Sequence, residues 1–201
     1  MGLQVTIAIE GTTDAAVIRR LLDEAGLQTD REYVKKGKSA LDQSLSAYNN
    51  AARFSCWLVV RDLDQDAKCA PDLRRTLLVH PAAHMRLHIP VHSVEAWLMA
   101  DSQHISEFLS VPRSKIPTDP EALPHPKRAL VDIARLSRKK AIREAMVPPP
   151  GTAAVGPGYS AMLVDFSINH WRPSVASSRS GSLARLRTFL RRKAQAAGEQ
   201  T

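Results

Sequence analysis

The sequence predicts an α/β protein with a mostly parallel, four-stranded sheet flanked by helices, followed by a basic helical extension. Three observations support this fold class. Short aliphatic runs alternate with helix-length segments in the first part of the 201-residue chain. Prolines then become frequent, and the later segments have helical periodicity. The net charge also changes sign between the two parts, which we place at residues 1–112 and 113–201.

Four segments are predicted to be strands. The first, "VTIAIE" at 5–10, has three aliphatic residues among six. The second is the short segment "REYVKKG" at 31–37, the third is "FSCWLVVRD" at 54–62, and the fourth is "MRLHIPV" at 85–91. A helix-length segment separates each strand from the next, which favours parallel pairing.

Apolar residues at helical spacing predict the connecting helices. In the first of them Ala16, Val17, Leu21 and Leu22 recur at that spacing, and Gly26 ends the helix. The expected helices are 14–26, 39–52, 70–80 and 93–109 in the first part, and 127–146, 159–171 and 182–195 in the second.

The charge of +8 is unevenly distributed. Residues 1–112 hold 12 Lys/Arg and 14 Asp/Glu, a net charge of −2, whereas residues 113–201 hold 16 and 6, a net charge of +10. This asymmetry favours an acidic metal site beside a surface that binds a polyanion, and a solvated, arginine-rich pair of helices is the alternative. The candidate nucleic-acid-binding residues are Lys38, Arg128, Arg138, Lys139, Lys140, Arg185, Arg187, Arg191 and Arg192.

Several classes of protein are disfavoured by composition. No apolar run approaches the roughly 18 residues that a membrane helix needs. The N-terminus lacks a basic region, so we expect no signal peptide, and the two cysteines cannot form a zinc site alone. We therefore expect a cytoplasmic protein without a membrane partner.

Acidic residues follow two of the predicted strands. Glu10 ends the first strand, and Asp62 and Asp64 follow the third in "LVVRDLDQD". Functional groups gather beyond the carboxyl ends of parallel strands, so these three should meet if the two strands are neighbours. Asp14 falls in the first turn of the first helix. Carboxylates converging in this way suit Mg²⁺ or Mn²⁺, which prefer oxygen ligands.

These residues resemble a known family. "EGTTD" after the first strand and "DLD" after the third look like the TOPRIM domain, which primases, topoisomerases and OLD-type nucleases share. Further on, "IPVHSVEAWLMAD" is similar to a stretch in small stand-alone TOPRIM-like proteins of bacteria. The resemblance covers residues 5–101 and extends loosely through "HPKRAL" and "GYSAMLVDFSINHW".

The resemblance implies roles for individual residues. Glu10 corresponds to the TOPRIM glutamate, a metal ligand or general acid/base, and Asp62 and Asp64 correspond to the DxD metal ligands. Asp14 and Glu95 would help to hold a second ion. Lys127 is the candidate for the lysine that OLD-type enzymes place near the scissile phosphate. The chain departs from that pattern at Val60, where a small polar residue is common, and we expect none of these 201 residues to form the large ATPase domain.

Most of these residues also have structural interpretations. Asp14 would favour the positive end of its helix without binding a metal. Glu95 would be a buried acid paired with an arginine, and Asp66 a loop acid. Lys38 would be an ordinary surface lysine.

Other motifs fail on spacing. A calcium-binding EF-hand loop needs Gly and Glu where this chain has Ala67 and Leu73. A dehalogenase-type phosphatase carries its DxD motif on the first strand rather than the third. His88 and His92 would share one strand face, but a zinc site there lacks further ligands.

The function implied is metal-dependent phosphodiester cleavage of nucleic acid with one or two Mg²⁺ or Mn²⁺ ions. DNA is favoured over RNA as the substrate, but the sequence leaves both open. The resemblance implies a role in phage defence or DNA repair with a separately encoded ATPase partner. The alternative is a non-catalytic nucleic-acid-binding or regulatory subunit with a TOPRIM-like fold.

Overall fold

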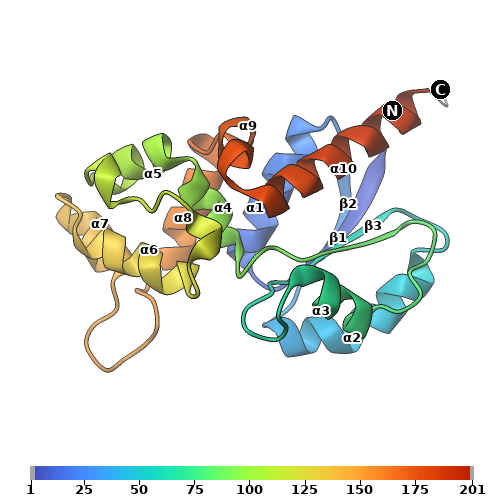
Figure 1. The fold of residues 1–201 in the computed structure, drawn as a ribbon, viewed down its shortest axis with the longest axis horizontal. Coiled ribbons are helices and arrows are strands. Elements are labelled where there is room, and N and C mark those ends of the chain that lie inside the picture. The colour runs from blue at the N-terminus through green and yellow to red at the C-terminus, as the bar shows by residue number, and fades with distance from the viewer. Residues whose placement is uncertain (1–2, 200–201) are drawn as a thin grey trace.

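The fold is built on one parallel sheet (Figure 1). The computed structural model describes residues 3–199. Its strands are β1 (Gln4–Ile9), β2 (Gln28–Val34), β3 (Trp57–Val60) and β4 (Met85–His88). They lie in the order β2-β1-β3-β4, and every neighbouring pair is parallel. The predicted α/β class and four-stranded parallel sheet are confirmed.

Side chains alternate between the two faces of the sheet. Ile7, Ile9 and Val60 join one buried apolar cluster, whereas Ala8 and Val59 join a second. The helices that contribute to the first cluster include α1 (Thr12–Glu24), α8 (Tyr159–Asn169) and α10 (Gly181–Gly198). Those contributing to the second are α2 (Lys38–Ala51) and α3 (Ala70–Leu77). The sheet is therefore covered by helices on both faces.

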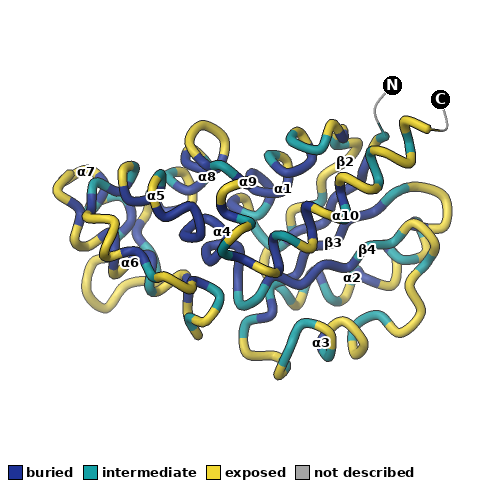
Figure 2. The backbone as a smooth tube through the Cα atoms, turned by 45° about the horizontal axis from the view of Figure 1, so that its top comes forward, coloured by how far each residue is buried: buried dark blue, intermediate teal, exposed yellow. Residues whose placement is uncertain are grey.

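Helix α4 (Val94–Ala100) lies at the centre of the molecule, and all seven of its residues are buried (Figure 2). The remaining helices are α5 (Ser102–Leu109), α6 (Pro126–Arg135), α7 (Lys140–Met146) and α9 (Pro173–Ala176), with 3-10 turns at Arg113–Lys115, Pro120–Ala122 and Ser177–Arg179. Leu163, Phe166 and Leu186 belong to the same apolar cluster as Ile7 and Ile9. Residues 113–199 thus share a core with the sheet.

Two predicted helices are each broken into two. The segment 93–109 divides at Asp101, whose carboxylate accepts a hydrogen bond from His104 N (3.4 Å) and pairs with Arg172 (2.7 Å). The segment 127–146 divides after Arg135, where the Arg138 N–H donates to the Ser110 carbonyl (3.1 Å). In both places a polar group finds a partner outside the helix, so the chain turns.

Over residues 3–199, the helices are all too short or too polar to span a lipid bilayer.

Arg187 does not lie on the surface where the sequence analysis placed it. Its side chain is buried, and its Nε and Nη2 atoms donate to the two carboxylate oxygens of Glu24 on α1 (2.9 and 2.6 Å). The pair joins α10 to the end of α1. The expected contact with nucleic acid is therefore wrong for Arg187, because its guanidinium is already bound.

Replacing Arg187 with alanine should lower the free energy of unfolding by about 2 kcal/mol, because Glu24 loses the closer of its two arginine partners and keeps only Arg191, 3.8 Å away. Urea denaturation followed by circular dichroism measures this. Arg192→Ala removes the same charge from an exposed position of α10 and should change stability by less than about 0.5 kcal/mol. Equal stabilities of the two variants would contradict a stabilising role for the pair.

Candidate metal centre

The acids after β1 and β3 meet at the carboxyl edge of the sheet. These strands are neighbours, with Ala8 paired to Val59. Glu10 follows β1, and its Oε1 accepts a hydrogen bond from the backbone N–H of Asp62 (3.0 Å). The predicted adjacency of Glu10 and Asp62 is confirmed, and it results from the strand order.

A cavity of about 190 Å³ lies behind this edge. It is lined by Asp14 from α1, Asp62, Glu95 from α4, Lys127 from α6 and Tyr159 from α8, among others. Each of these side chains comes from a different segment, so the cavity exists only once α6 and α8 have packed against the sheet domain.

Asp62 is the least compensated acid of this cavity. Its Oδ1 atom is buried and has no hydrogen-bond partner among the described residues. Burial raises the pKa of Asp62 well above its usual value, and the negative charges of Asp14, Glu95, Glu10 and Asp64 raise it further. A bound proton or a cation would relieve the repulsion among these carboxylates.

Asp14 is part of the same group. Burial, followed by the charge of Glu95, raises the pKa of Asp14 to about 7. Burial is also the main cause of the raised pKa of Glu10, which the hydrogen bond from Asp62 partly offsets. Glu95 and Glu10 both act on Asp14, which favours a shared site over a simple helix-end role.

Glu95 is buried, with 3% of its surface exposed, and it has two polar neighbours. The Tyr159 hydroxyl donates to Glu95 Oε1 (3.2 Å), and Lys127 Nζ lies 3.7 Å from the same oxygen. Glu95 is therefore a buried acid, but its charged partner is Lys127 and not the arginine that the structural interpretation expected. The negative charge of Glu95 is the main cause of the raised pKa of Lys127, and the charges of Asp62 and Asp14 contribute less. The Lys127 ammonium group therefore stays protonated. The structure thus places Lys127 beside Glu95, and its role near a scissile phosphate stays a prediction.

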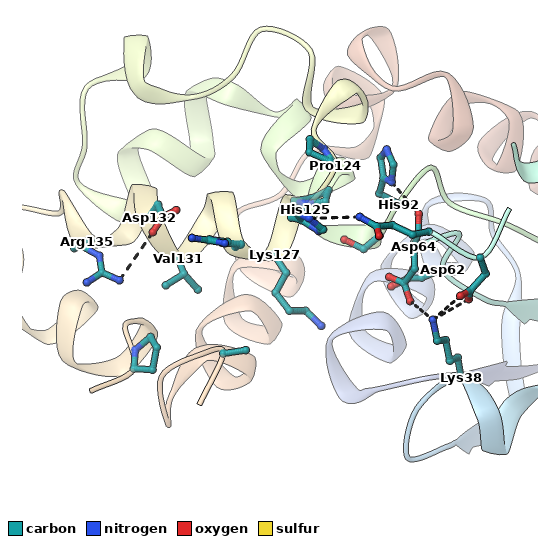
Figure 3. Close-up of a pocket in the computed structure, with 17 residues that line it drawn as sticks. Lys38, Asp62, Asp64, His92, Pro124, His125, Lys127, Val131, Asp132 and Arg135 are labelled. Carbon is teal, nitrogen blue, oxygen red and sulfur yellow. Dashed lines mark hydrogen bonds and ion pairs between the residues drawn. The ribbon is translucent and has the colours of Figure 1, made fainter. Parts of the chain in front are cut away.

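Asp64 lies differently from Asp62. Its Oδ2 accepts a hydrogen bond from Lys38 Nζ (3.1 Å), which also pairs with Asp66 (2.8 Å) (Figure 3). Asp64 and His92 both have positive φ, at 47° and 61°. The Asp64 N–H donates to the His92 carbonyl, and the His92 ring contacts the Asp64 carbonyl, both at 3.1 Å. This strained contact fixes the two loops that follow β3 and β4.

Within residues 3–199, no three Asp, Glu, His or Cys side chains are arranged closely enough to form a ready-made metal site. Lys38 instead neutralises Asp64, while Asp62 keeps its unpaired oxygen. The metal site expected from Glu10, Asp62 and Asp64 therefore stays a prediction.

Arg61 was missed in the sequence analysis. It is buried, pairs with Asp42 and Asp66 (3.2 and 2.6 Å), and donates to the Asp62 carbonyl. A single arginine inside the acidic segment "RDLDQD" was the available signal. Tyr159 was missed too, and no local pattern points to it, because it approaches Glu95 from 64 residues away.

A larger cleft of about 790 Å³ opens beside the cavity. Asp62 and Lys127 line both spaces, and Lys38, Arg128 and Arg135 line the cleft (Figure 3). The other basic candidates do not line it: Arg138, Lys139 and Lys140 are exposed near the start of α7, and Arg185, Arg191 and Arg192 are exposed on α10. Two of the nine predicted phosphate-binding residues, Lys38 and Arg128, thus line the cleft beside the acids.

No protein-family model matches the chain, and the searches of curated proteins and of solved structures found no match either.

Proposed function

We propose that this protein is a metal-dependent phosphodiesterase that cleaves nucleic acid. The observation that carries the proposal is the buried Oδ1 of Asp62, which has no hydrogen-bond partner among residues 3–199. Neighbouring acids raise the pKa of Asp62, and the residue lines a cleft with a basic wall. Burying several carboxylates without a counter-ion is costly, so such a group is uncommon unless it serves a ligand.

The donor set fits a hard divalent cation. Asp62 and Glu10 would hold the first ion, and Asp14 and Glu95 the second, all through carboxylate oxygens, which Mg²⁺ and Mn²⁺ prefer. When bound, such an ion supplies charge neutralisation at the phosphate and activation of the attacking water. Asp64 would join this group if its contact with Lys38 opened.

Basic residues around the acids would position the substrate. Lys127 lies at the opening between cavity and cleft, where its ammonium group would contact the scissile phosphate. Arg128 and Arg135 follow on α6 and would contact neighbouring phosphates of the strand. Such contacts bind the backbone without selecting a base sequence.

The second candidate function is a non-catalytic nucleic-acid-binding or regulatory subunit. The contact of Lys38 with Asp64 favours it, because an ammonium group then neutralises an acid that the cleavage mechanism would assign to a metal. In this case the basic wall of the cleft would bind nucleic acid without turnover.

A cleavage assay tests the proposal. The purified chain should cleave labelled DNA in Mg²⁺ or Mn²⁺ and not in EDTA, and Glu10→Gln should lower the rate on the order of 100-fold or more. Asp132→Asn is the matched control, because Asp132 is an exposed acid of the same cleft and should not affect the rate. Equal rates for the two variants would exclude Glu10 from the reaction. Divalent-ion binding without cleavage of DNA or RNA would favour the regulatory function.

The wider setting comes from the resemblance to TOPRIM and OLD-type proteins. A cytoplasmic role in phage defence or DNA repair, an ATPase partner, and DNA rather than RNA as substrate are all predictions. Pull-down from the native host would test the prediction of an ATPase partner.

A further inference from the structure

A second basic site lies away from the acids, at the free edge of β4. A cavity of about 380 Å³ is lined there by Arg74 from α3, Arg86 from β4 and Arg185 from α10. These three residues are far apart in the sequence and come together through the packing of α3 and α10 beside the edge strand. The other lining residues are Ala70, Pro71, Leu87, His88 and Ile89, so the described residues that line this cavity include no acid.

The three guanidinium groups have no carboxylate partner in the part of the chain that the structure describes. Among the described residues, none of the three forms an ion pair within 4.0 Å, although Arg86 lies over the ring of Phe189 (4.7 Å to its centre). Other arginines of this chain are paired, for example Arg172 with Asp101 (2.7 Å). Gathering unpaired cations around one space is unfavourable unless an anion binds there.

Two buried polar atoms at the cavity support this view. Arg86 Nε and His88 Nε2 are both buried without a hydrogen-bond partner in the described residues. His88 is 4% exposed, and burial, followed by the charges of Arg86 and Arg185, lowers its pKa to about 3. Burial and the charges of Arg74 and Arg185 also lower the pKa of Arg86. Unsatisfied buried groups of this kind are uncommon in structural sites.

We propose that the cavity between α3, β4 and α10 binds a phosphate group through Arg74, Arg86 and Arg185. Guanidinium groups match phosphate oxygens with paired hydrogen bonds, which makes arginine the usual residue for this ligand. An adjoining cavity of about 380 Å³ shares Arg74, Arg86 and Leu87 and is lined also by Arg75, Leu78, Val79, Pro81 and Met85. The remainder of a phosphate ester therefore has a largely apolar space beside the arginines.

The phosphate would be either a free anion or part of a nucleic-acid backbone. The chemistry of recognition is the same for both, and the site needs no metal. The inference does not rest on the proposed cleavage activity, because phosphate binding is measured in EDTA, where cleavage is absent.

The test uses the full chain in phosphate-free buffer with EDTA. Inorganic phosphate and pyrophosphate are titrated by calorimetry, and a short single-stranded oligonucleotide by fluorescence anisotropy. Whichever of these probes the wild type binds, the double variant Arg74→Gln/Arg185→Gln should bind it at least about tenfold more weakly, as expected for lost charge-assisted hydrogen bonds. Both side chains are exposed and form no ion pair with the residues that the structure describes, so the variant should fold normally.

Arg192→Gln is the matched control, because it removes the same charge from an exposed position of α10 outside the cavity. It should leave affinity for the small anions within about twofold. Variant-sensitive binding of inorganic phosphate or pyrophosphate identifies a free anion as the ligand, and variant-sensitive binding of the oligonucleotide alone identifies the backbone. Wild-type affinity in the double variant, or no binding of any probe by the wild type, overturns the proposal.

Discussion

Asp62→Asn should raise the free energy of unfolding of the metal-free protein by about 2–3 kcal/mol at pH 8, although it removes a buried charged group. The reason is the repulsion among Asp62, Asp14, Glu95 and Glu10, together with the buried and unpartnered Oδ1 of Asp62. Removing one of several buried like charges relieves both the repulsion and the desolvation cost. Asparagine keeps the shape of the side chain.

Urea denaturation in EDTA, followed by circular dichroism, measures this effect. Adding Mg²⁺ or Mn²⁺ should then stabilise the wild type and not Asp62→Asn, because ligand binding to the native state adds to its stability. Asp132→Asn on α6 serves as the control and should change stability by less than about 0.5 kcal/mol. A lower stability of Asp62→Asn in EDTA would mean that the charge of Asp62 is already compensated in the native protein.

The metal-free protein should lose stability as the pH rises from about 4 to about 7. The pKa of Asp14 is raised from 3.8 to about 7 in the folded state, so the native protein binds a proton in this range that the unfolded chain has released. Stability falls with pH wherever the native state binds more protons. The full shift corresponds to about 2–4 kcal/mol once its coupling to the neighbouring acids is allowed for.

Denaturation curves at pH 4.5, 5.5, 6.5 and 7.5, values chosen to span roughly this window, test the prediction in EDTA. Asp14→Asn should flatten the dependence, because asparagine does not titrate. Asp66 and Asp101, whose pKa values are lowered by Lys38 and by Arg172, respectively, contribute stability that is lost only below pH 4 and do not disturb this range. An identical pH dependence in Asp14→Asn would assign the titration to another acid.

The parallel sheet was predictable because its signals are local. Aliphatic runs such as residues 5–10 and 85–91 have the length and composition of strands, and the helix-length segments between strands favour parallel connections. The acids after β1 and β3 could meet only if these two strands were neighbours. The observed strand order shows that they are. The helix breaks at Asp101 and after Arg135 were not predictable, because partners distant in the sequence cause them, namely Arg172 and Ser110.

The sequence alone determined which acids stand at the ends of strands: Glu10, Asp62 and Asp64 follow from strand position and require no knowledge of packing. Only the tertiary structure decided what surrounds them. In the folded chain the Asp62 N–H donates to Glu10, whereas Asp64 pairs with Lys38. Lys127 and Tyr159, which are distant in the sequence, lie beside Glu95. The tertiary structure also removed Arg187 from the surface and gathered Arg74, Arg86 and Arg185 at the edge of β4. The physical reason is that strand and helix periodicity is encoded within a few residues, whereas the partner of a charge depends on which distant segments pack together.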